Sequence, residues 1–113
     1  MNAPFYAQLE KLSEEFGYRV IPDEEDLNGI GYAALRNGRA SQAVEAFQLN
    51  VTYHPYSANA FDSLADGLAA LGEIALAIEA LEKAVALLGD RTDAQAEYIR
   101  NHRDELVEQH KSD

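Results

Sequence analysis

Residues 43–47 read Ala-Val-Glu-Ala-Phe, and residues 77–81, which lie 34 positions later, read Ala-Ile-Glu-Ala-Leu. The same offset places Gly38 over Gly72 and brings the apolar positions before each glycine into register. A fixed period of this length is typical of a repeated structural unit. The sequence therefore predicts two copies of one unit.

Each copy contains two segments in which apolar or small residues recur three or four positions apart, which predicts helices with one buried face. In the first copy these residues are Leu27, Ile30, Gly31, Ala34 and Leu35, followed by Ala43, Val44, Phe47 and Val51. Asn37-Gly38 and Leu71-Gly72 interrupt the pattern with turns so short that the helices they join must be antiparallel. The expected helices span residues 24–37, 41–53, 58–71 and 74–88.

The flanks of the repeats are also predicted to be helical. Phe5, Leu9, Leu12 and Phe16 form one apolar stripe of an expected helix over residues 4–16. Residues 92–95 have the spacing of a capping box, which predicts a last helix over residues 92–109. Residues 110–113 are expected to be a frayed tail.

The expected fold is all-α, with six antiparallel helices, because no segment alternates between apolar and polar residues as a strand does. We expect one domain with four parts. They are an N-terminal helix and linker (1–22), a first repeat (23–56), a second repeat (57–90), and a C-terminal capping helix with its tail (91–113).

The 113 residues carry 20 acidic and 9 basic side chains, for a formal net charge of -11. A chain this acidic lacks the basic face that binds phosphate, so we expect neither nucleic-acid binding nor docking on anionic membranes. The absence of cysteine excludes disulfides, thiol catalysis and Cys-ligated metals. No apolar run is long enough to span a bilayer, and we expect no secretory leader at the N-terminus. The expected location is the cytoplasm, unless the chain belongs to a longer, exported protein.

The repeated unit resembles the tetratricopeptide repeat, a helix–turn–helix unit of the same period. The resemblance rests on small residues where two paired helices would meet and on a glycine in each turn: Gly31, Ala43 and Gly38, then Ala65, Ala77 and Gly72. The sequence departs from the pattern at Asn50, where a small residue is usual, and at Gly89, where proline is usual. The resemblance covers about residues 24–90 and implies stacked helices that bind a peptide or protein partner.

A narrower resemblance concerns four segments: residues 27–32, 47–51, 53–55 and 57–64. They are similar to repeat segments found C-terminal to bacterial serine hydrolases, namely esterases of the α/β-hydrolase type and β-lactamase-like enzymes. Residues 6–13 and 16–18 resemble the link that leads out of such an esterase domain. This resemblance implies an alternative function, an accessory or oligomerisation domain of a hydrolase, and it assigns no catalytic residue to this chain.

No pattern for nucleophilic or acid–base catalysis is complete. None of the serines lies in a Gly-x-Ser-x-Gly elbow, and Ser57 is placed where it would cap a helix. The adjacent acids at 24–26 and at 104–105 would diverge on a helix instead of converging on a substrate. We therefore expect a protein that is not an enzyme and has no catalytic residue.

The three histidines do not form a metal site in the sequence. His102 and Glu105 are spaced to share one helix face, but no third ligand accompanies them. We interpret His54, His102 and His110 as surface residues, and we expect no metal and no cofactor.

A polar row crosses the two expected repeats. Tyr32 shares a helix face with Asn28 and Arg36, away from the apolar stripe. At the offset of 34 residues, Asn28 matches Asp62 and Tyr32 matches Asp66. In stacked helical repeats the first helices of successive units line a concave surface, so these residues predict a groove.

Carrying the same offset into the last helix adds Glu97 and Arg100 to these rows, with Arg103 one turn further on. The expected partner-binding residues are Asn28, Tyr32, Arg36, Asp62, Asp66, Arg100 and Arg103. An acidic centre flanked by arginines would favour a ligand with a basic or hydrogen-bond-donating centre over an acidic C-terminal tail. A solvated polar face would give the same pattern, and the stripe between Phe5 and Phe16 offers the alternative of a homodimer.

Overall fold

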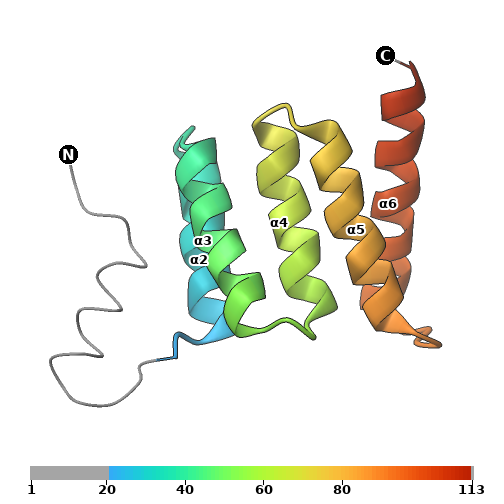
Figure 1. Cartoon of the computed structure of the whole chain (residues 1–113), viewed down its shortest axis with the longest axis horizontal. Helices are drawn as coiled ribbons and strands as arrows, with labels where there is room; N and C mark the ends of the chain where they lie inside the picture. Colours follow the sequence, from blue (N-terminus) through green and yellow to red (C-terminus); the bar gives the residue numbers. More distant parts are fainter. Residues whose placement is uncertain (1–20, 113) are drawn as a thin grey trace, which may run out of the picture.

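The computed structural model describes residues 21–112, and every regular element in that range is an α-helix (Figure 1). The helices are α2 (Glu24–Arg36), α3 (Ala40–Tyr53), α4 (Ala58–Ala70), α5 (Ile74–Leu88) and α6 (Ala94–Ser112). The all-α prediction is confirmed for this part of the chain. The helix expected over residues 4–16 lies outside the described residues.

The four helices of the two repeats begin and end within one residue of the expected positions. The last helix differs more, because it begins two residues later than expected and continues to Ser112. The prediction of a frayed tail is therefore wrong for residues 110–112. Basic residues in the last turn suit the negative end of the helix dipole, and the Ser112 hydroxyl donates to the Glu108 carbonyl at 3.0 Å.

Side-chain caps fix where α2 and α4 begin. The Asp23 carboxylate accepts from the backbone N–H of Glu25 at 3.2 Å, and the Ser57 hydroxyl accepts from the backbone N–H of Ala60 at 3.1 Å. Each cap satisfies a donor that the first turn of a helix leaves unpaired. The interpretation of Ser57 as a capping residue is confirmed.

The turns between paired helices have the same geometry in both repeats. Gly38 has φ +71° and Gly72 has φ +85°, a region that glycine adopts without steric penalty. In each turn the residue after the glycine donates its backbone N–H to the carbonyl five positions back, at 2.8 Å in the first turn and 2.9 Å in the second. These bonds satisfy carbonyls at the ends of α2 and α4. The same type of turn therefore occurs twice, 34 positions apart.

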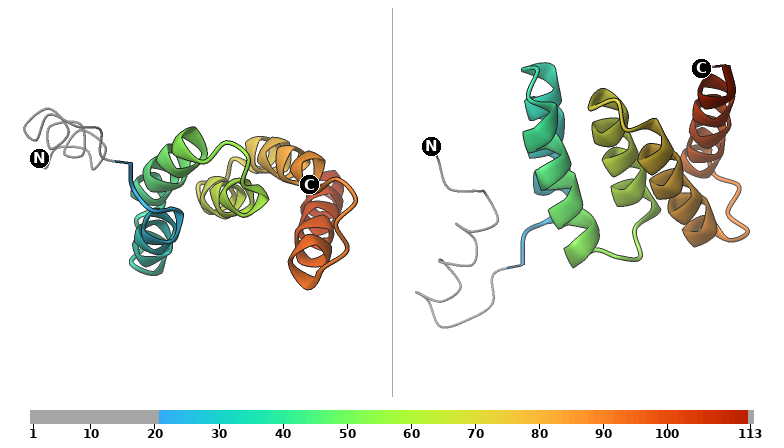
Figure 2. Two further views of the ribbon diagram at one scale, coloured as in Figure 1. Left: turned by 90° about the horizontal axis from the view of Figure 1, so that it is seen from below. Right: turned by 45° about the horizontal axis from the view of Figure 1, so that its top comes forward.

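The helices form two layers (Figure 2). Helices α3 and α5 lie in one layer, and α2, α4 and α6 lie in the other. Most of the buried residues are apolar, and the largest fully buried ones are Leu27, Phe47, Leu81 and Ile99. Because consecutive helices are antiparallel, α2, α4 and α6 run in the same direction (Figure 1).

Phe47 of α3 is the tightest point of this core. Its ring lies between two glycines, Gly31 of α2 and Gly67 of α4. A Cβ atom added at Gly31 would lie 2.2 Å from Cε1 of the ring, and one at Gly67 would lie 2.9 Å from Cδ2. The expectation that Gly31 lets two helices approach closely is confirmed.

Ile30 does not fill the core as the sequence pattern suggested. Its side chain is 42% exposed, whereas its counterpart one repeat later, Leu64, is 6% exposed. Leu64 is buried because α4 packs against α3 on one side and α5 on the other. Among residues 21–112, no helix precedes α2. The apolar stripe of α2 is therefore only partly covered by the residues that the structure describes.

Candidate functional site

Helix α4 lies between α2 and α6 (Figure 2, left), and these three helices line a hollow, with α4 as its floor and α2 and α6 as its walls. Residues from all three helices meet on the floor, and they come from both repeats and the last helix. We call this surface the groove. The polar row in the sequence predicted a groove on the surface of these helices.

Tyr32 reaches from the α2 wall to the floor. Its hydroxyl donates to Oδ2 of Asp66 at 2.5 Å and lies 3.3 Å from the Ser63 hydroxyl oxygen. Its ring meets the Phe47 ring edge-on, with centroids 5.0 Å apart. Tyr32 is thus held at both ends, by the core at its ring and by α4 at its hydroxyl.

His102 reaches from the α6 wall to the same place. Its Nδ1 lies 2.6 Å from Oδ1 of Asp62, and its Nε2 lies 3.4 Å from Oδ1 of Asp66. Asp62 is 5% exposed, so this pairing satisfies a carboxylate that is almost fully buried. Together Tyr32, Ser63, Asp66, His102 and Asp62 form a continuous set of polar contacts across the groove, which we call the polar bridge.

The polar bridge has the electrostatics of a protonated histidine between two acids. Both ring nitrogens of His102 face carboxylate oxygens, and only the imidazolium carries a donor on each nitrogen. The hydrogen bond to Asp62 raises the pKa of His102, and burial opposes that rise. Burial also raises the pKa of Asp66, and burial together with the bond to Asp66 raises the pKa of Tyr32.

Replacing His102 with glutamine is expected to lower the free energy of unfolding in a pH-dependent way. A histidine whose pKa is raised by folding stabilises the folded state below its unfolded pKa of about 6.5, and this contribution is lost as the pH rises through the folded value. Hydrogen bonds to charged groups predict a loss of about 1.5 kcal/mol at pH 5.5 that becomes smaller toward pH 8.5. Urea unfolding at a series of pH values measures it.

His110→Gln is the matched control, because His110 is exposed on the same helix. Its effect on stability should be small across the same pH range. A loss in His102→Gln that does not change with pH would contradict the imidazolium bridge.

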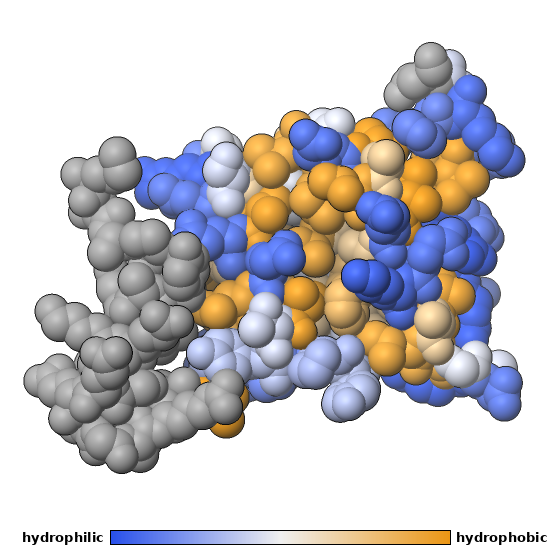
Figure 3. Space-filling view, in the orientation of Figure 1, coloured by the Kyte–Doolittle hydropathy of each residue, from blue (hydrophilic) through white to orange (hydrophobic). Residues whose placement is uncertain are grey.

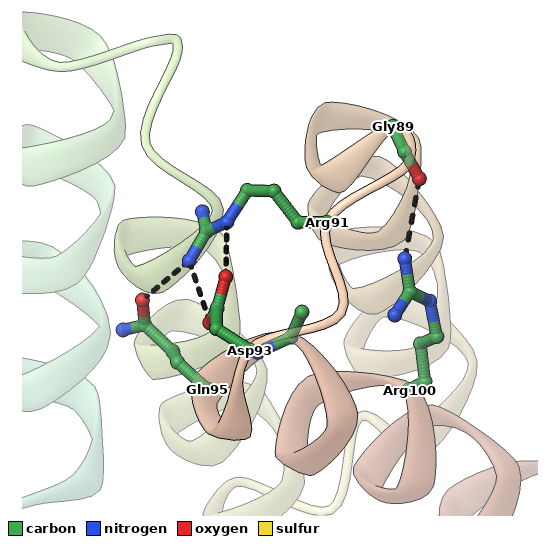
Figure 4. A network of polar contacts seen from close by, with 6 residues as sticks. Gly89, Arg91, Asp93, Gln95 and Arg100 are labelled. Atoms are coloured by element: carbon green, nitrogen blue, oxygen red, sulfur yellow. Dashed lines mark hydrogen bonds and ion pairs between the residues drawn. The ribbon is translucent and has the colours of Figure 1, made fainter.

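The structure places Arg100 and Arg103 away from the polar bridge. Arg100 donates to the carbonyl of Gly89 at 3.2 Å, at the corner between α5 and α6 (Figure 4). Arg103 lies between Glu82 of α5 at 3.3 Å and Asp104 at 2.6 Å. The expectation that arginines flank the acidic centre of the groove is therefore corrected, and the residue of α6 that lies there is His102.

The reason is the length of the last connection. The capping residues Asp23 and Ser57 are 34 positions apart, but Asp93, which accepts from the backbone N–H of Ala96 at 3.1 Å, follows Ser57 by 36. With two extra residues, Asp66 aligns with His102 instead of Arg100. The spacing between the capping residues can be read from the sequence, and it would have aligned His102 with Asp66.

A hollow of about 270 Å³ lies at the end of the groove where α2, α4 and α6 begin. Its lining contains two acids, three amide side chains and four other residues. They are Glu24 and Glu25, then Asn28, Asn59 and Gln95, then Tyr56, Ser57, Ala58 and Arg91. Glu25, Asn59 and Gln95 occupy one row of the groove when the longer last connection is counted. The hollow and the polar bridge are thus successive levels of the same groove.

Arg91 is held at the rim of the hollow by residues of its own segment. It makes two bonds to the Asp93 carboxylate, at 2.8 and 3.0 Å, and one to the Gln95 amide oxygen at 3.1 Å (Figure 4). This pairing keeps the pKa of Asp93 well below its usual range. The positive charge of Arg91 is therefore matched locally.

The two remaining predicted residues lie at opposite ends of the α2 wall. Asn28 lines the hollow, and its Oδ1 accepts no hydrogen bond from residues 21–112. Arg36 is exposed in the last turn of α2, one turn beyond Tyr32. Of the seven predicted residues, the structure brings Tyr32, Asp62 and Asp66 into one set of contacts.

The opposite side of the molecule differs in character. Figure 3 shows apolar side chains gathered across the middle of the face formed by α3, α4 and α5. A shallow hollow of about 410 Å³ runs along α3, where Val44 and Leu49 contribute apolar surface. This side therefore carries an apolar surface patch.

None of the five described helices combines the length and the apolar character that crossing a membrane requires. Among residues 21–112, no three His, Cys, Asp or Glu side chains are grouped as metal ligands would be. Neither the protein-family models nor the curated proteins that were compared with this chain give a match. A function must therefore be argued from the groove itself.

Proposed function

We propose that this chain is a non-catalytic interaction module of the tetratricopeptide type, and that its groove binds a basic segment of a peptide or protein. The observation that carries the proposal is the charge of the groove. Glu24 and Glu25 line its hollow and Asp66 lies on its floor. Arg91, at the rim of the hollow, is paired with Asp93, and Arg100 and Arg103 are bound elsewhere.

The repeat geometry supports a tetratricopeptide-like architecture. Helices α2 and α4 begin 34 positions apart, as do α3 and α5, and both turns use a glycine in the same left-handed conformation. Small residues lie where the paired helices meet, at Gly31, Ala43 and Ala77. Stacked units of this kind present a rigid concave surface that loses little entropy on binding.

The polar bridge supports a preformed site on the floor of the groove. Asp62 is already paired and buried, so it positions His102 and is not itself a contact for a partner. Asp66 has 29% of its side chain exposed, so it can receive a donor from a ligand. A lysine or arginine side chain would meet one accessible carboxylate here and further acids at the hollow.

An aromatic side chain stands at the rim. Tyr56 lines the hollow and is 87% exposed, which is unusual for a large aromatic residue. Tyrosine faces attract arginine and lysine cations, and exposed aromatic residues are enriched among binding hot spots. Tyr56 next to Glu24 and Glu25 therefore fits the same basic ligand.

Long-range electrostatics act in the same direction. The formal net charge of -11 attracts basic partners and repels acidic ones, which raises association rates with basic ligands at low salt. An acidic C-terminal tail is disfavoured, because the described residues that line the hollow include no unpaired arginine: Arg91 is already bound to Asp93.

Glu25→Lys is expected to weaken the binding of basic peptides about fivefold at low salt, as the loss of an exposed ion pair predicts. The effect should become smaller at high salt because screening weakens exposed charge pairs. An array of lysine- and arginine-containing peptides, with acidic peptides on the same array, measures it at two salt concentrations. Glu25 is chosen because it is exposed. Reversing the charge of the buried Asp62 would disturb folding as well as binding.

Glu79→Lys is the matched control, since Glu79 is exposed on α5 and the net charge changes equally. It should change binding less than twofold. Equal losses in both variants would mean that only the net charge matters. Preferential capture of acidic peptides would show that the proposed ligand class is wrong.

The alternative proposal, an accessory domain of a bacterial serine hydrolase, is supported by the resemblance of residues 27–32 and 57–64 to such segments. The complete gene is the test. An upstream reading frame with a Gly-x-Ser-x-Gly or Ser-x-x-Lys motif would favour it, and a gene without either motif would remove it.

A further inference from the structure

Two side chains from opposite walls of the groove share the Asp66 carboxylate. Its Oδ2 accepts the hydrogen bond from the Tyr32 hydroxyl at 2.5 Å, and its Oδ1 lies 3.4 Å from Nε2 of His102. The contact with His102 is the looser of the two, because 3.4 Å is longer than a charge-assisted hydrogen bond usually is. Since 29% of the Asp66 side chain is exposed, a ligand in the groove can compete for this carboxylate at the looser contact.

The other ring nitrogen of His102 is held tightly. Its Nδ1 lies 2.6 Å from Oδ1 of Asp62, whose side chain is 7% exposed. A buried carboxylate needs a donor, so Nδ1 keeps its proton whether the ring is charged or neutral. When His102 loses a proton, the proton must therefore leave from Nε2, the nitrogen that faces Asp66.

Loss of that proton changes what this pair of side chains can bind. In the imidazolium, Nε2 carries a donor directed at Asp66, whereas in the neutral ring Nε2 is an acceptor. Nε2 and Oδ1 of Asp66 are then two acceptors that face each other 3.4 Å apart. A lysine ammonium with three donors, or an arginine guanidinium with five, could bond to both of them.

We propose that a cationic N–H group of the bound basic segment takes the place of the Nε2 proton of His102 at Asp66, so that binding in the groove releases a proton. This inference rests on the proposed function, because it requires a basic ligand in the groove. The Nε2–H bond breaks, the proton passes to water or buffer, and the ligand cation restores the charge that the polar bridge has lost. His102 thus occupies the ligand's place until the ligand arrives.

The surroundings of His102 keep the ring charged before a ligand binds. The charged and titratable groups around it are Asp62 and Asp66 of α4, Tyr98 and Glu105 of α6, and Tyr32 of α2, which reaches Asp66. On α5, Glu82 is already paired with Arg103. The hydrogen bond to Asp62 raises the pKa of His102 above its usual value of about 6.5, against the opposing effect of burial. In mildly acidic solution the ligand must therefore displace a proton.

The pH dependence of peptide binding tests this exchange. The probe is an acetylated and amidated hexapeptide of alternating lysine and arginine, which has no group that titrates between pH 6.0 and 8.5. At constant ionic strength we expect a Kd at least about fourfold lower at pH 8.5 than at pH 6.0, because a pKa above 6.5 leaves at most about a quarter of His102 uncharged at pH 6.0.

Two variants show whether His102 is the group responsible. His102→Gln keeps the other histidines, and its Kd should change less than twofold between the two pH values. His110→Gln is the matched control, because His110 is exposed on the same helix, and it should keep the pH dependence of the unmodified chain.

Calorimetry on the unmodified chain gives a second measurement that stands even if His102→Gln fails to fold. Titrations at pH 6.5 in two buffers of different ionisation enthalpy count the protons, and we expect at least about half a proton released per peptide bound. Binding without proton release, and with equal Kd at pH 6.0 and 8.5, would overturn this inference and leave the proposed function standing. Undiminished release in His102→Gln would also overturn it. No binding of the hexapeptide at any pH would overturn the proposed function, and this inference with it.

Discussion

Gly31→Ala is expected to lower the free energy of unfolding by about 3 kcal/mol, although it adds a single methyl group. The new Cβ atom would lie 2.2, 2.5 and 2.6 Å from three carbon atoms of the Phe47 ring. The ring has little room to move, because Gly67 meets its other side and the residue is fully buried. Helices α2 and α3 would have to separate. Urea unfolding followed by circular dichroism measures the loss.

Gly29→Ala is the control for this prediction. It makes the same change in the same helix, but the added Cβ atom meets nothing within 4 Å. Alanine is the better helix former, so this variant should be more stable than the unmodified chain by about 0.5–1 kcal/mol. Similar losses in the two variants would show that helix propensity, and not contact with Phe47, determines the result.

Phe47→Ala is expected to have an equal or larger effect, a loss of about 3–5 kcal/mol. The side chain is 0% exposed and links α2, α3 and α4, so its removal leaves a cavity where both layers meet. It also removes the edge contact that supports the Tyr32 ring. Thermal unfolding would show the loss as a large decrease in Tm.

Phe61→Ala is the matched control, since Phe61 is only partly buried against the core. It should destabilise the chain less than Phe47→Ala does. A loss below about 1 kcal/mol for Phe47→Ala would contradict the packing described above. Gly31→Ala combined with Phe47→Leu should be less harmful than the sum of the two single changes, because the smaller side chain makes room for the methyl group.

The repeat and its helices could be predicted from the sequence because local signals determine them. The turn glycines Gly38 and Gly72 stand where a left-handed conformation is required, and Ser57 stands where a helix needs a cap. The period of 34 residues also predicted which helices pair with each other. The ends of the four repeat helices were predicted within one residue, whereas the start of α6 was predicted two residues too early.

The groove was predicted only in part, because its last wall does not follow the period. His102 was interpreted as a surface residue, since a lone histidine on a helix has no local signal that shows a buried carboxylate opposite it. Arg100 was placed in the groove by extending an offset that holds only between the first two units. The bond from Tyr32 to Asp66 depends on distances between helices, which sequence spacing does not give.

The exposure of Ile30 shows a different limit. Its spacing matches the buried stripe of α2, but burial also depends on a neighbouring element. A pattern in the sequence identifies the apolar face of a helix, and it cannot say which segment covers that face.

The longer connection before α6 also bears on how this array could be lengthened. A further unit added after α6 would join a helix that is out of phase with the two before it, so its side chains would meet the wrong neighbours. A second copy of residues 55–88 inserted after Leu88 would keep the phase and leave α6 as the terminal helix. The enlarged protein would carry a second Asp62 and Asp66 along a longer groove. This molecule can therefore be extended from within, but not from its end.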